Sequence, residues 1–461
     1  MRAARARVLI ERNDGRESVG QAIPMWTYYP DLLATPVPRY TSFPTAAEFG
    51  TGVTASDYKA ALASASGNVS LYVHIPYCEK ICWYCGCNTG AANRPQRLTS
   101  YLDALHREIA LVAERLPASA RVKRIAFGGG SPNALPPDDF LRLMDAVAAN
   151  FPLDAPLISV ELDPRSLTEE WGPVIKAVGT QYASMGVQTF APHLQQAIGR
   201  IQPLSMIERS VELLRNAGIR SLNFDLMYGL PGQVRADLTD TLRRAEYLGA
   251  DRIALFGYAH VPHLIPRQRR IDHTALPSQE ERFAMAELGY RQLARAGYVP
   301  VGFDHFARPA DPLARAALGG TLRRNFQGFT DDQASVLLGL GASAISSFPG
   351  LLIQNEKNSG RYRMLLSQDI LPAAHGVRRS ADDRYRASTI ESLLCKGRAR
   401  IGLDLTRETA LPLRPFLQTG LCRFEEGTLI IASDALPYAR SIAAAFDPYR
   451  QESARRFSSA V

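Results

Sequence analysis

Hydrophobic positions alternate between two patterns through the middle of the chain, and together they predict an α/β fold. Short β-branched apolar runs predict strands at 70–75, 123–127, 157–162, 182–187, 221–226, 252–257 and 298–303. Stretches with a 3.6-residue apolar period predict helices at 98–116, 137–150, 167–178, 204–217, 236–248 and 278–296. This alternation predicts parallel strands with right-handed crossovers, in an open doubly wound sheet or in a full or partial (β/α) barrel. Active-site residues are then expected at the carboxyl ends of the strands.

The repeat stops at both ends, which predicts three parts. Residues 1–52 are expected to form an N-terminal arm, of which the Arg-rich stretch 1–18 has no strong periodicity and is expected to be disordered. Residues 53–384 are the predicted catalytic domain. Residues 385–461 are predicted to form a small, mainly helical C-terminal domain that covers the active site and contains short strands around 422–432.

Composition is that of a globular enzyme. The chain has 461 residues, of which 46 % are hydrophobic and 21 % are charged. No apolar run approaches the roughly 20 residues of a membrane helix, so a soluble, cytoplasmic protein is expected. The net charge of +8 fits a mildly basic enzyme, and it also fits one with an acidic substrate or a nucleic-acid partner. The net charge alone does not distinguish these three classes of protein.

Four of the six cysteines lie within ten residues, directly after the first predicted strand. They are Cys78, Cys82, Cys85 and Cys87, with the spacing Cys-x3-Cys-x2-Cys-x-Cys. Clustered thiols without the spread of a disulfide framework indicate a metal site. Three thiolates can hold an iron–sulfur cluster and leave one iron open. Structural zinc prefers four ligands, typically as two separated pairs, so the spacing favours iron–sulfur and leaves zinc as the alternative.

Glycine or polar residues follow four successive predicted strands. Gly128, Gly129, Gly130 and Ser131 come after 123–127, and the next three strands end near Glu161, Gln188 and Asp225. A glycine run permits close approach of backbone to a ligand, although a plain turn has the same composition. Four such strand ends in one register predict a binding site there.

The cysteine motif resembles the signature of the radical S-adenosylmethionine (SAM) superfamily. That resemblance implies a partial (β/α)6 barrel and one [4Fe–4S] cluster held by Cys78, Cys82 and Cys85. It also implies that SAM binds the open iron. Tyr84 resembles the aromatic residue before the third cysteine, whose backbone lies near the adenine.

Further phrases resemble the oxygen-independent coproporphyrinogen III oxidase family: PRYTSFPTA (38–46), LYVHIPYC (71–78), CGCN (85–88), GVQTF (186–190), NFDLMYGLPGQ (223–233), YAHVP (258–262), DHFARP (304–309), RNFQGFT (324–330) and FDPYRQESARRFS (446–458). The resemblance implies anaerobic oxidative decarboxylation of coproporphyrinogen III to protoporphyrinogen IX in haem biosynthesis. A 5′-deoxyadenosyl radical is expected to take a hydrogen from the propionate β-carbon. A reductant such as flavodoxin or ferredoxin is implied, as is a monomer with neither a nucleic-acid nor a membrane partner.

The same resemblance implies two SAM molecules and assigns residues to each. Tyr72, Gly129, Glu161 and Ile345 match positions at the first SAM. Gly130, Ser131, Gln188, Arg200, Asp225 and Ala259 match positions at the second. Ser131 and Asn133 depart from a usual threonine.

Three residues are expected to act on the substrate or in catalysis. Arg39 on the arm matches a position near the propionates, Gln327 lies in the phrase RNFQGFT, and Cys87 is required without ligating the cluster. Cys87 and the PRYTS arm favour the oxidase over its rival, a haem chaperone or haem-degrading radical SAM relative, since the chaperones usually have Phe at that position. Arg308 and Arg324 are weaker candidates for binding carboxylates.

Overall fold

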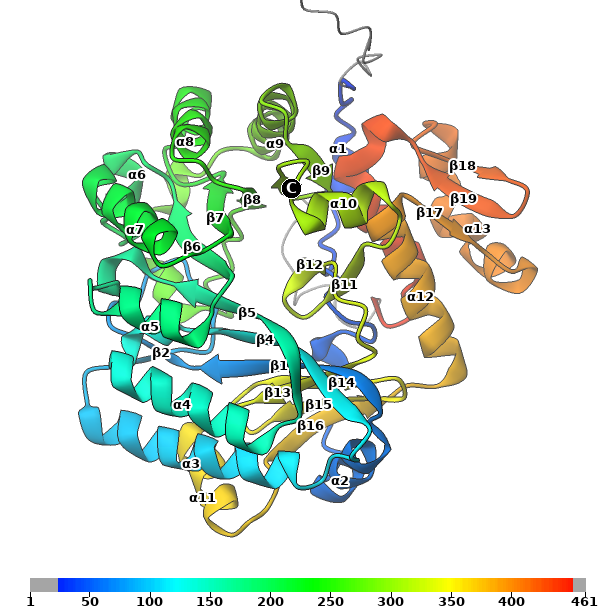
Figure 1. Ribbon diagram of the computed structural model, residues 1–461. Helices are drawn as coiled ribbons and strands as arrows, with labels where there is room; N and C mark the ends of the chain where they lie inside the picture. The colour runs from blue at the N-terminus through cyan, green and yellow to red at the C-terminus, as the bar shows by residue number, and fades with distance from the viewer. Residues whose placement is uncertain (1–23, 451–461) are drawn as a thin grey trace, which may run out of the picture.

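A twelve-stranded sheet forms the centre of the computed structural model, which describes residues 24–450 (Figure 1). The strand order is β16-β15-β14-β13-β1-β4-β5-β6-β7-β8-β10-β9. Seven neighbours from β13 to β8 run parallel, and the strands on either side of them are antiparallel. The strands of this sheet are β1 (Gly67–Ile75), β4 (Ala120–Gly129), β5 (Leu153–Leu162), β6 (Tyr182–Gln188), β7 (Ser221–Tyr228), β8 (Arg252–Gly257), β9 (Val299–Val301), β10 (His305–Ala307), β13 (Val336–Leu340), β14 (Ile345–Phe348), β15 (Leu351–Asn355) and β16 (Ala373–Arg378).

Helices connect the parallel strands and cover the outer face of the sheet (Figure 1). They are α3 (Pro95–Ala113), α4 (Pro137–Asn150), α5 (Trp171–Val178), α6 (Pro192–Ala197), α7 (Leu204–Asn216), α8 (Arg235–Tyr247) and α9 (Gln279–Arg295). The apolar stripe of α3 is buried at Leu98, Leu102, Leu105, Ile109 and Val112, so one face packs on the sheet. The strands β1, β4, β5, β6, β7 and β8 are neighbours in chain order, which confirms the partial (β/α)6 barrel.

The seventh predicted strand is wrong in its direction. Within 298–303 only β9 is a strand, and it pairs antiparallel with β10 rather than continuing the parallel series. The chain reverses between them because Gly302 adopts a left-handed φ of +60°, so no helix crossover intervenes. The sequence pattern also missed β13 to β16, because three of these four strands are joined by short antiparallel turns and lack the strand–helix alternation.

The remaining elements form smaller units around the barrel. They are α1 (Pro30–Leu33), α2 (Ala55–Ser64), β2 (Tyr77–Cys78), β3 (Gly90–Ala91), α10 (Pro312–Leu318), β11 (Arg323–Asn325), β12 (Gly328–Thr330), α11 (Ser359–Ser367), α12 (Ala381–Lys396), β17 (Arg398–Arg400), α13 (Leu403–Gln418), β18 (Cys422–Glu425), β19 (Thr428–Ile431) and α14 (Ala439–Ala443). The short strands expected around 422–432 are thus confirmed as β18 and β19. The three-part division of the chain stays a prediction.

The N-terminal arm and the C-terminal region meet beside the barrel (Figure 1). The hydroxyl of Tyr438 accepts a hydrogen bond from the Tyr29 backbone N–H at 2.8 Å and donates one to the Thr27 carbonyl at 2.8 Å. The Trp26 backbone N–H donates to Glu287 of α9 at 3.1 Å. The arm is therefore anchored to both the barrel and the C-terminal region. The expected disorder of residues 1–18 lies outside the described residues.

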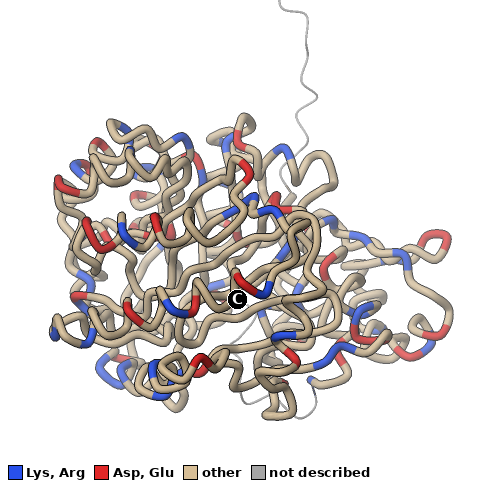
Figure 2. The backbone as a smooth tube through the Cα atoms, turned by 60° about the horizontal axis from the view of Figure 1, so that its bottom comes forward, with Lys and Arg blue, Asp and Glu red and all other residues tan. Residues whose placement is uncertain are grey.

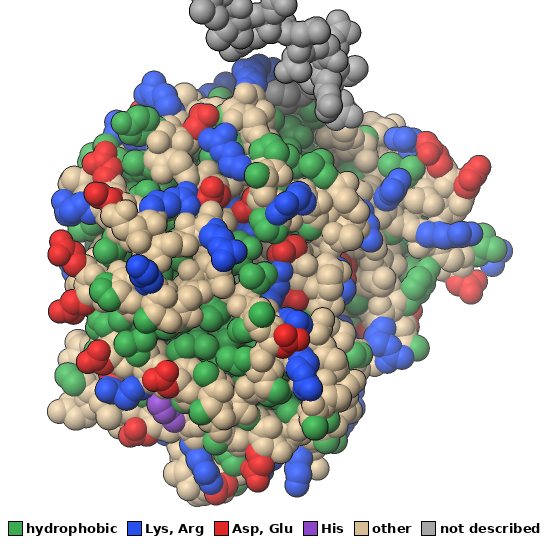
Figure 3. All heavy atoms as spheres, in the orientation of Figure 1, with side chains coloured by type: hydrophobic (Ala, Val, Ile, Leu, Met, Phe, Trp, Pro, Cys, Tyr) green, Lys and Arg blue, Asp and Glu red, His purple; other side chains and the backbone are tan. Residues whose placement is uncertain are grey.

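Charged residues of both signs are distributed over the molecule. Figure 2 shows basic and acidic positions interspersed along the tube, and the face in Figure 3 shows charged side chains of both signs around a hydrophobic area on its lower left. Neither view shows the contiguous basic face that is typical of nucleic-acid binding. Within residues 24–450, no helix is both long and apolar enough to span a bilayer.

Candidate active site

A cavity of about 620 Å³ opens at the carboxyl ends of β4 to β8, where the alternation of strands and helices predicts it. The cysteine loop that follows β1 forms one wall. Of the predicted site residues, the lining includes Arg39, Cys78, Cys82, Tyr84, Cys85, Cys87, Gly129, Gly130, Glu161, Gln188, Arg200, Asp225 and Ala259.

Four predicted site residues do not line this cavity. Tyr72 lies on β1, where its hydroxyl is 3.2 Å from Nδ1 of His74. Ser131 is buried behind the glycine turn, and Ile345 begins β14. Gln327 is exposed in the turn between β11 and β12. The structure does not bring Gln327 to the cavity, and its role stays a prediction.

Two buried arginines neutralise the loop at Cys82. Nη1 of Arg200 and Nη2 of Arg165 each lie 3.1 Å from Cys82 Sγ. Both also bind the Asp163 carboxylate, Arg165 at 2.6 Å and Arg200 at 3.2 Å. Burial alone would raise the pKa of Asp163, but Arg200 and Arg165 outweigh it and lower that pKa. Two arginines against one carboxylate leave a net positive charge beside the Cys82 sulfur.

The donor set fits a cluster better than a single metal ion. Cys78, Cys82 and Cys85 face the same cavity, yet within residues 24–450 no three Cys, His, Asp or Glu side chains are grouped closely enough for one ion. A cubane takes each thiolate on a different iron, so its ligands stand farther apart. Burial raises the pKa of the Cys78 thiol to about 12, and a bound iron would displace that proton.

The glycine turn after β4 lets the backbone pass directly under the cysteine loop. The Gly130 N–H donates to the Ile75 carbonyl and the Ser131 N–H to the Tyr77 carbonyl, both at 2.8 Å. A Cβ at Gly130 would lie 2.4 Å from the Tyr77 carbonyl oxygen. Gly129 has a φ of +111°, which only glycine adopts freely. This turn therefore requires glycine at 130 because a side chain would clash with the Tyr77 backbone, and at 129 because of the backbone conformation.

Ser131 and Asn133, the two departures from threonine, connect the turns after β4 and β5. Ser131 Oγ donates to Asn133 Oδ1 at 2.5 Å. Asn133 in turn accepts from the Asp163 backbone N–H and donates to the Asp163 carbonyl, both at 2.9 Å. The asparagine amide makes both bonds at once, which a threonine hydroxyl at one position could not reproduce with this geometry. The two departures thus belong to one buried hydrogen-bond network.

Two carboxyl groups line the cavity at the ends of β5 and β7, where Glu161 is accessible to solvent and Asp225 is half-buried. Burial raises the pKa of Glu161 to about 7, and its Oε2 accepts a hydrogen bond from the Gly129 N–H at 3.1 Å. Burial also raises the pKa of Asp225, which accepts from Ser184 Oγ at 3.1 Å and from Asn223 Nδ2 at 2.8 Å. Perturbed carboxyls at strand ends are suited to binding a cationic or hydroxyl-bearing ligand.

The large cavity is also lined by Gln268, a residue that was not predicted from the sequence. Gln268 Nε2 donates to the carbonyls of Tyr84 at 2.9 Å and Ala259 at 3.0 Å. Its Oε1 accepts from the Val261 N–H at 2.6 Å. One buried side chain thus joins the cysteine loop to the loop after β8. No periodicity or motif in the sequence marks this residue.

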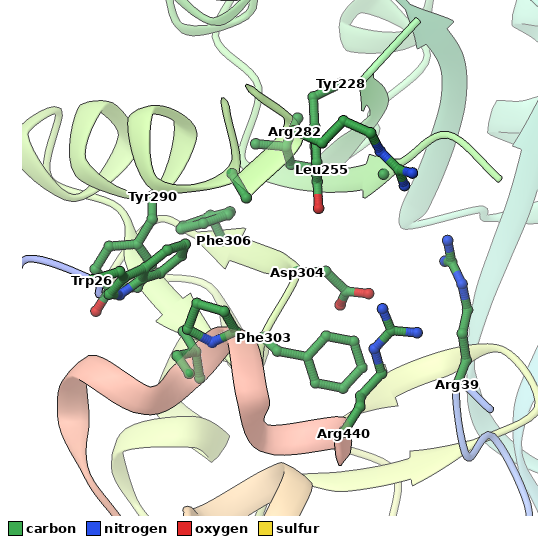
Figure 4. Close-up of a pocket in the computed structure, with 14 residues that line it drawn as sticks. Trp26, Arg39, Tyr228, Leu255, Arg282, Tyr290, Phe303, Asp304, Phe306 and Arg440 are labelled. Carbon is green, nitrogen blue, oxygen red and sulfur yellow. The ribbon is translucent and has the colours of Figure 1, made fainter. Parts of the chain in front are cut away.

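A second, smaller cavity adjoins the first and shares Arg39 and Gly257 with it. Figure 4 shows side chains entering it from the arm, from α9 and from the C-terminal region. Arg39 also packs over the ring of Phe256 at 4.9 Å. Arg324, a weaker carboxylate candidate, donates to the Arg39 carbonyl at 3.0 Å and so positions the arm. Arg308 packs on Tyr298 at 4.0 Å and lines neither cavity.

Other residues in these walls were not identified from the sequence. Asp163 and Arg165 directly follow a predicted strand, so applying the strand-end rule one step further would have found them. Arg282 and Arg440 lie on a helix and near the C-terminus, where nothing local distinguishes them from solvated arginines. Only the fold brings them to a cavity.

The chain is similar over most of its length to proteins of one family. Residues 72–245 match the model of the Radical SAM superfamily. The oxygen-independent coproporphyrinogen III oxidase of Bradyrhizobium diazoefficiens is 42 % identical over 437 residues, covering 92 % of this chain and 97 % of that protein. The protein of the same name from Escherichia coli is 35 % identical over 432 residues, covering 91 % and 94 %.

One solved structure is similar in both sequence and fold. Coproporphyrinogen III oxidase (HemN) from Escherichia coli, described as a radical SAM enzyme, matches with a TM-score of 0.87 at 34 % identity. The match covers 92 % of this chain and 99 % of that one. The similarity therefore extends well beyond the barrel and its cysteine loop.

Proposed function

Because this chain belongs to the oxygen-independent coproporphyrinogen III oxidases, a family of radical SAM enzymes, we propose which of its residues carry out the family's reaction. The reaction is the anaerobic oxidative decarboxylation of coproporphyrinogen III in haem biosynthesis. Its product, protoporphyrinogen IX, has vinyl groups in place of two propionates. The assignment rests on one observation above all. The cysteine loop and the polar ends of β4 to β8 line a single cavity.

Cys78, Cys82 and Cys85 hold the [4Fe–4S] cluster in this proposal. When bound, the cluster and SAM supply the one-electron chemistry that removes a hydrogen from a propionate side chain. Arg165 and Arg200 compensate the thiolate charge at Cys82 through their hydrogen bonds to Sγ. Because all three cysteines line the large cavity, a cluster held there would present its open iron to a ligand bound in that cavity.

The polar strand ends bind two SAM molecules. Tyr72, Tyr84, Gly129, Glu161 and Ile345 are assigned to the first, and Gly130, Ser131, Gln188, Arg200, Asp225 and Ala259 to the second. Glu161 and Asp225 suit the ammonium or ribose hydroxyls of such a ligand, because both are hydrogen-bond acceptors at the cavity wall. Tyr72, Ser131 and Ile345 would act from just behind that wall.

Arg39 and Cys87 are assigned to the substrate side of the cavity. Arg39 reaches it from the arm with a guanidinium group, which binds carboxylates in a bidentate manner. The Cys87 backbone is held by Arg267, whose Nη2 donates to the Cys87 carbonyl at 2.9 Å. Gln327 would need the β11–β12 turn to move before it could act there.

The decisive experiment is anaerobic reconstitution followed by turnover with coproporphyrinogen III, SAM and a chemical reductant. We expect protoporphyrinogen and 5′-deoxyadenosine as products. Two neighbouring substitutions form a matched pair. Cys85→Ser should lose the cluster absorbance, whereas Cys87→Ser should keep it and lose turnover. An intact cluster with no vinyl product, accompanied by stoichiometric haem binding, would instead favour the haem chaperone.

The cellular context follows from the same chemistry. We propose a cytoplasmic monomer reduced by flavodoxin or ferredoxin, because four clustered free thiols require a reducing compartment. Sedimentation of the reconstituted enzyme tests the monomer. Turnover with each purified reductant in place of the chemical one tests the electron donor.

A further inference from the structure

The smaller cavity has the size of a functional group rather than of a cofactor. Its volume is about 50 Å³, and it lies between β7, β8, α9, the arm and the turn before α14. One water molecule needs about 10–15 Å³ of such space, so the cavity suits a small polar group such as a carboxylate. Arg39 and Gly257 line both this cavity and the large one. A molecule bound in the large cavity could therefore place one of its side groups in the small one.

Positive charge predominates in the lining. Arg39, Arg282 and Arg440 all reach the cavity, and Asp304 is its one acidic residue among those that the structure describes (Figure 4). Asp304 already has a partner, since its Oδ1 lies 2.6 Å from Nδ1 of His305. Three guanidinium groups and one carboxylate line so small a space, so a bound anion would reduce the repulsion among the arginines.

Two buried donors in the lining have no hydrogen-bond partner. They are Nε of Arg282 and Nε1 of Trp26, and the Trp26 side chain comes from the arm on the opposite side. Arg282 Nη2 donates to the Tyr258 carbonyl at 3.0 Å, which fixes the guanidinium and leaves Nε without an acceptor. A buried unsatisfied donor costs about 1–3 kcal/mol. An acceptor bound in the cavity removes that cost.

The arginines stay charged despite their burial. Burial lowers the pKa of Arg440 to about 10, with Arg39 adding to the effect, and burial likewise lowers the pKa of Arg282. Arg282 and Arg440 remain cations at neutral pH, because deprotonation of arginine needs far higher pH. The lining therefore offers cationic donors to a bound acceptor.

We propose that this cavity is a carboxylate subsite that takes one propionate of the substrate, one that is not at the reacting position. The inference rests on the proposed function, which supplies a substrate with four propionates. No residue of the cysteine loop lines the cavity, so a propionate seated here is separated from the cluster. Filling it would fix how the macrocycle presents its other propionates to the large cavity.

Three separate parts of the chain form the subsite. Trp26 and Arg39 come from the arm, Arg282 from α9, and Leu436, Pro437 and Arg440 from the C-terminal region. Each part contributes a donor or an apolar wall, so the subsite is complete only when all three are docked. Substrate recognition is thereby separated from the cofactor residues at the strand ends.

Reconstituted Arg282→Gln enzyme provides the first test. We expect KM for coproporphyrinogen III and Kd for coproporphyrin III, followed by fluorescence, to rise roughly 10- to 100-fold, the scale of a lost charge-assisted hydrogen bond. Cluster absorbance and the Kd for SAM should not change. Arg282→Lys should recover part of the affinity. Arg295→Gln, an exposed arginine on the same helix, is the matched control and should bind like the wild type.

A second variant keeps every charge and fills the space. Ala286→Val adds two methyl groups to the lining and should weaken porphyrin binding in the same way. Wild-type affinity in this variant overturns the subsite, whether or not Arg282→Gln folds. If the wild type forms no protoporphyrinogen yet both variants lose porphyrin binding, the proposed function fails and the subsite stands. If the wild type turns over and both variants keep its KM, only the subsite fails.

Discussion

Substituting Gly130 by alanine should loosen the cysteine loop, because the added methyl group meets backbone rather than side chain. An ideal Cβ at this position lies 2.4 Å from the carbonyl oxygen, 2.7 Å from the nitrogen and 2.8 Å from the carbonyl carbon of Tyr77. Ordinary contacts begin at 3.4 Å, so the Tyr77 oxygen must retreat by about 1 Å. Tyr77 directly precedes Cys78, so the displacement reaches the first cluster ligand.

The cost can be worked from the same contacts. Overpacking a well-packed site typically costs about 1–3 kcal/mol. Two hydrogen bonds hold this turn, from Gly130 N–H to Ile75 and from Ser131 N–H to Tyr77, and losing them costs about 1 kcal/mol each. The expected destabilisation is therefore about 3–5 kcal/mol, which is a large part of the stability of an ordinary domain.

Two measurements check the destabilisation by Gly130→Ala: the midpoint of thermal unfolding and the iron content after anaerobic reconstitution. We expect Gly130→Ala to lower both. Gly350→Ala is the matched control, because Gly350 has no atom within 4 Å of its ideal Cβ and lacks a positive φ. The control should change stability by no more than about 0.5 kcal/mol. A Gly130→Ala enzyme with the midpoint and iron content of the control would refute the reasoning.

Three further substitutions separate SAM binding from substrate binding. Gln268→Leu leaves the carbonyls of Tyr84 and Ala259 without their donor, so SAM should bind several-fold more weakly while iron content is unchanged; equal SAM affinity would count against it. Burial raises the pKa of Glu161 to about 7, so its carboxylate forms only as pH rises through that value. SAM, a cation, should therefore bind more tightly at pH 8 than at pH 6 in the wild type, and Glu161→Gln should abolish this difference; an identical pH dependence in both would contradict the assignment. Arg39→Ala should weaken turnover of coproporphyrinogen III while SAM cleavage continues, and unchanged turnover would remove Arg39 from the site.

The parts of the fold and site that sequence reasoning predicted are those encoded locally. The parallel strands read as short, β-branched apolar runs, which locates β1 and β4 to β8 to within a few residues. The cysteine loop and the glycine turn are each contained in about ten residues. Because parallel strands end at one edge of a sheet, the strand pattern alone predicts that Glu161, Gln188 and Asp225 lie together, and all three line the large cavity.

The parts that were missed depend on contacts between distant segments. The small cavity combines Trp26, Arg282 and Arg440, which are separated by more than 150 residues along the chain. An arginine on an amphipathic helix has the same local pattern whether it is solvated or faces a cavity. Strands β13 to β15 were missed for a related reason, since the antiparallel hairpins that join them contain no helix and so do not continue the strand–helix alternation.

The position of Arg39 shows why the arm and the C-terminal region belong to one functional unit. Arg324, from β11, donates to the carbonyls of Arg39 at 3.0 Å and Tyr40 at 3.2 Å. The Tyr40 hydroxyl donates to Asp447 at 2.9 Å, so the next residue along the arm is held by the C-terminal region. The backbone of Arg39 is thus fixed from two sides, and its guanidinium is left to face both cavities. Weakening the Tyr40–Asp447 contact would release the arginine that lines both cavities without touching any residue assigned to the cluster or to SAM.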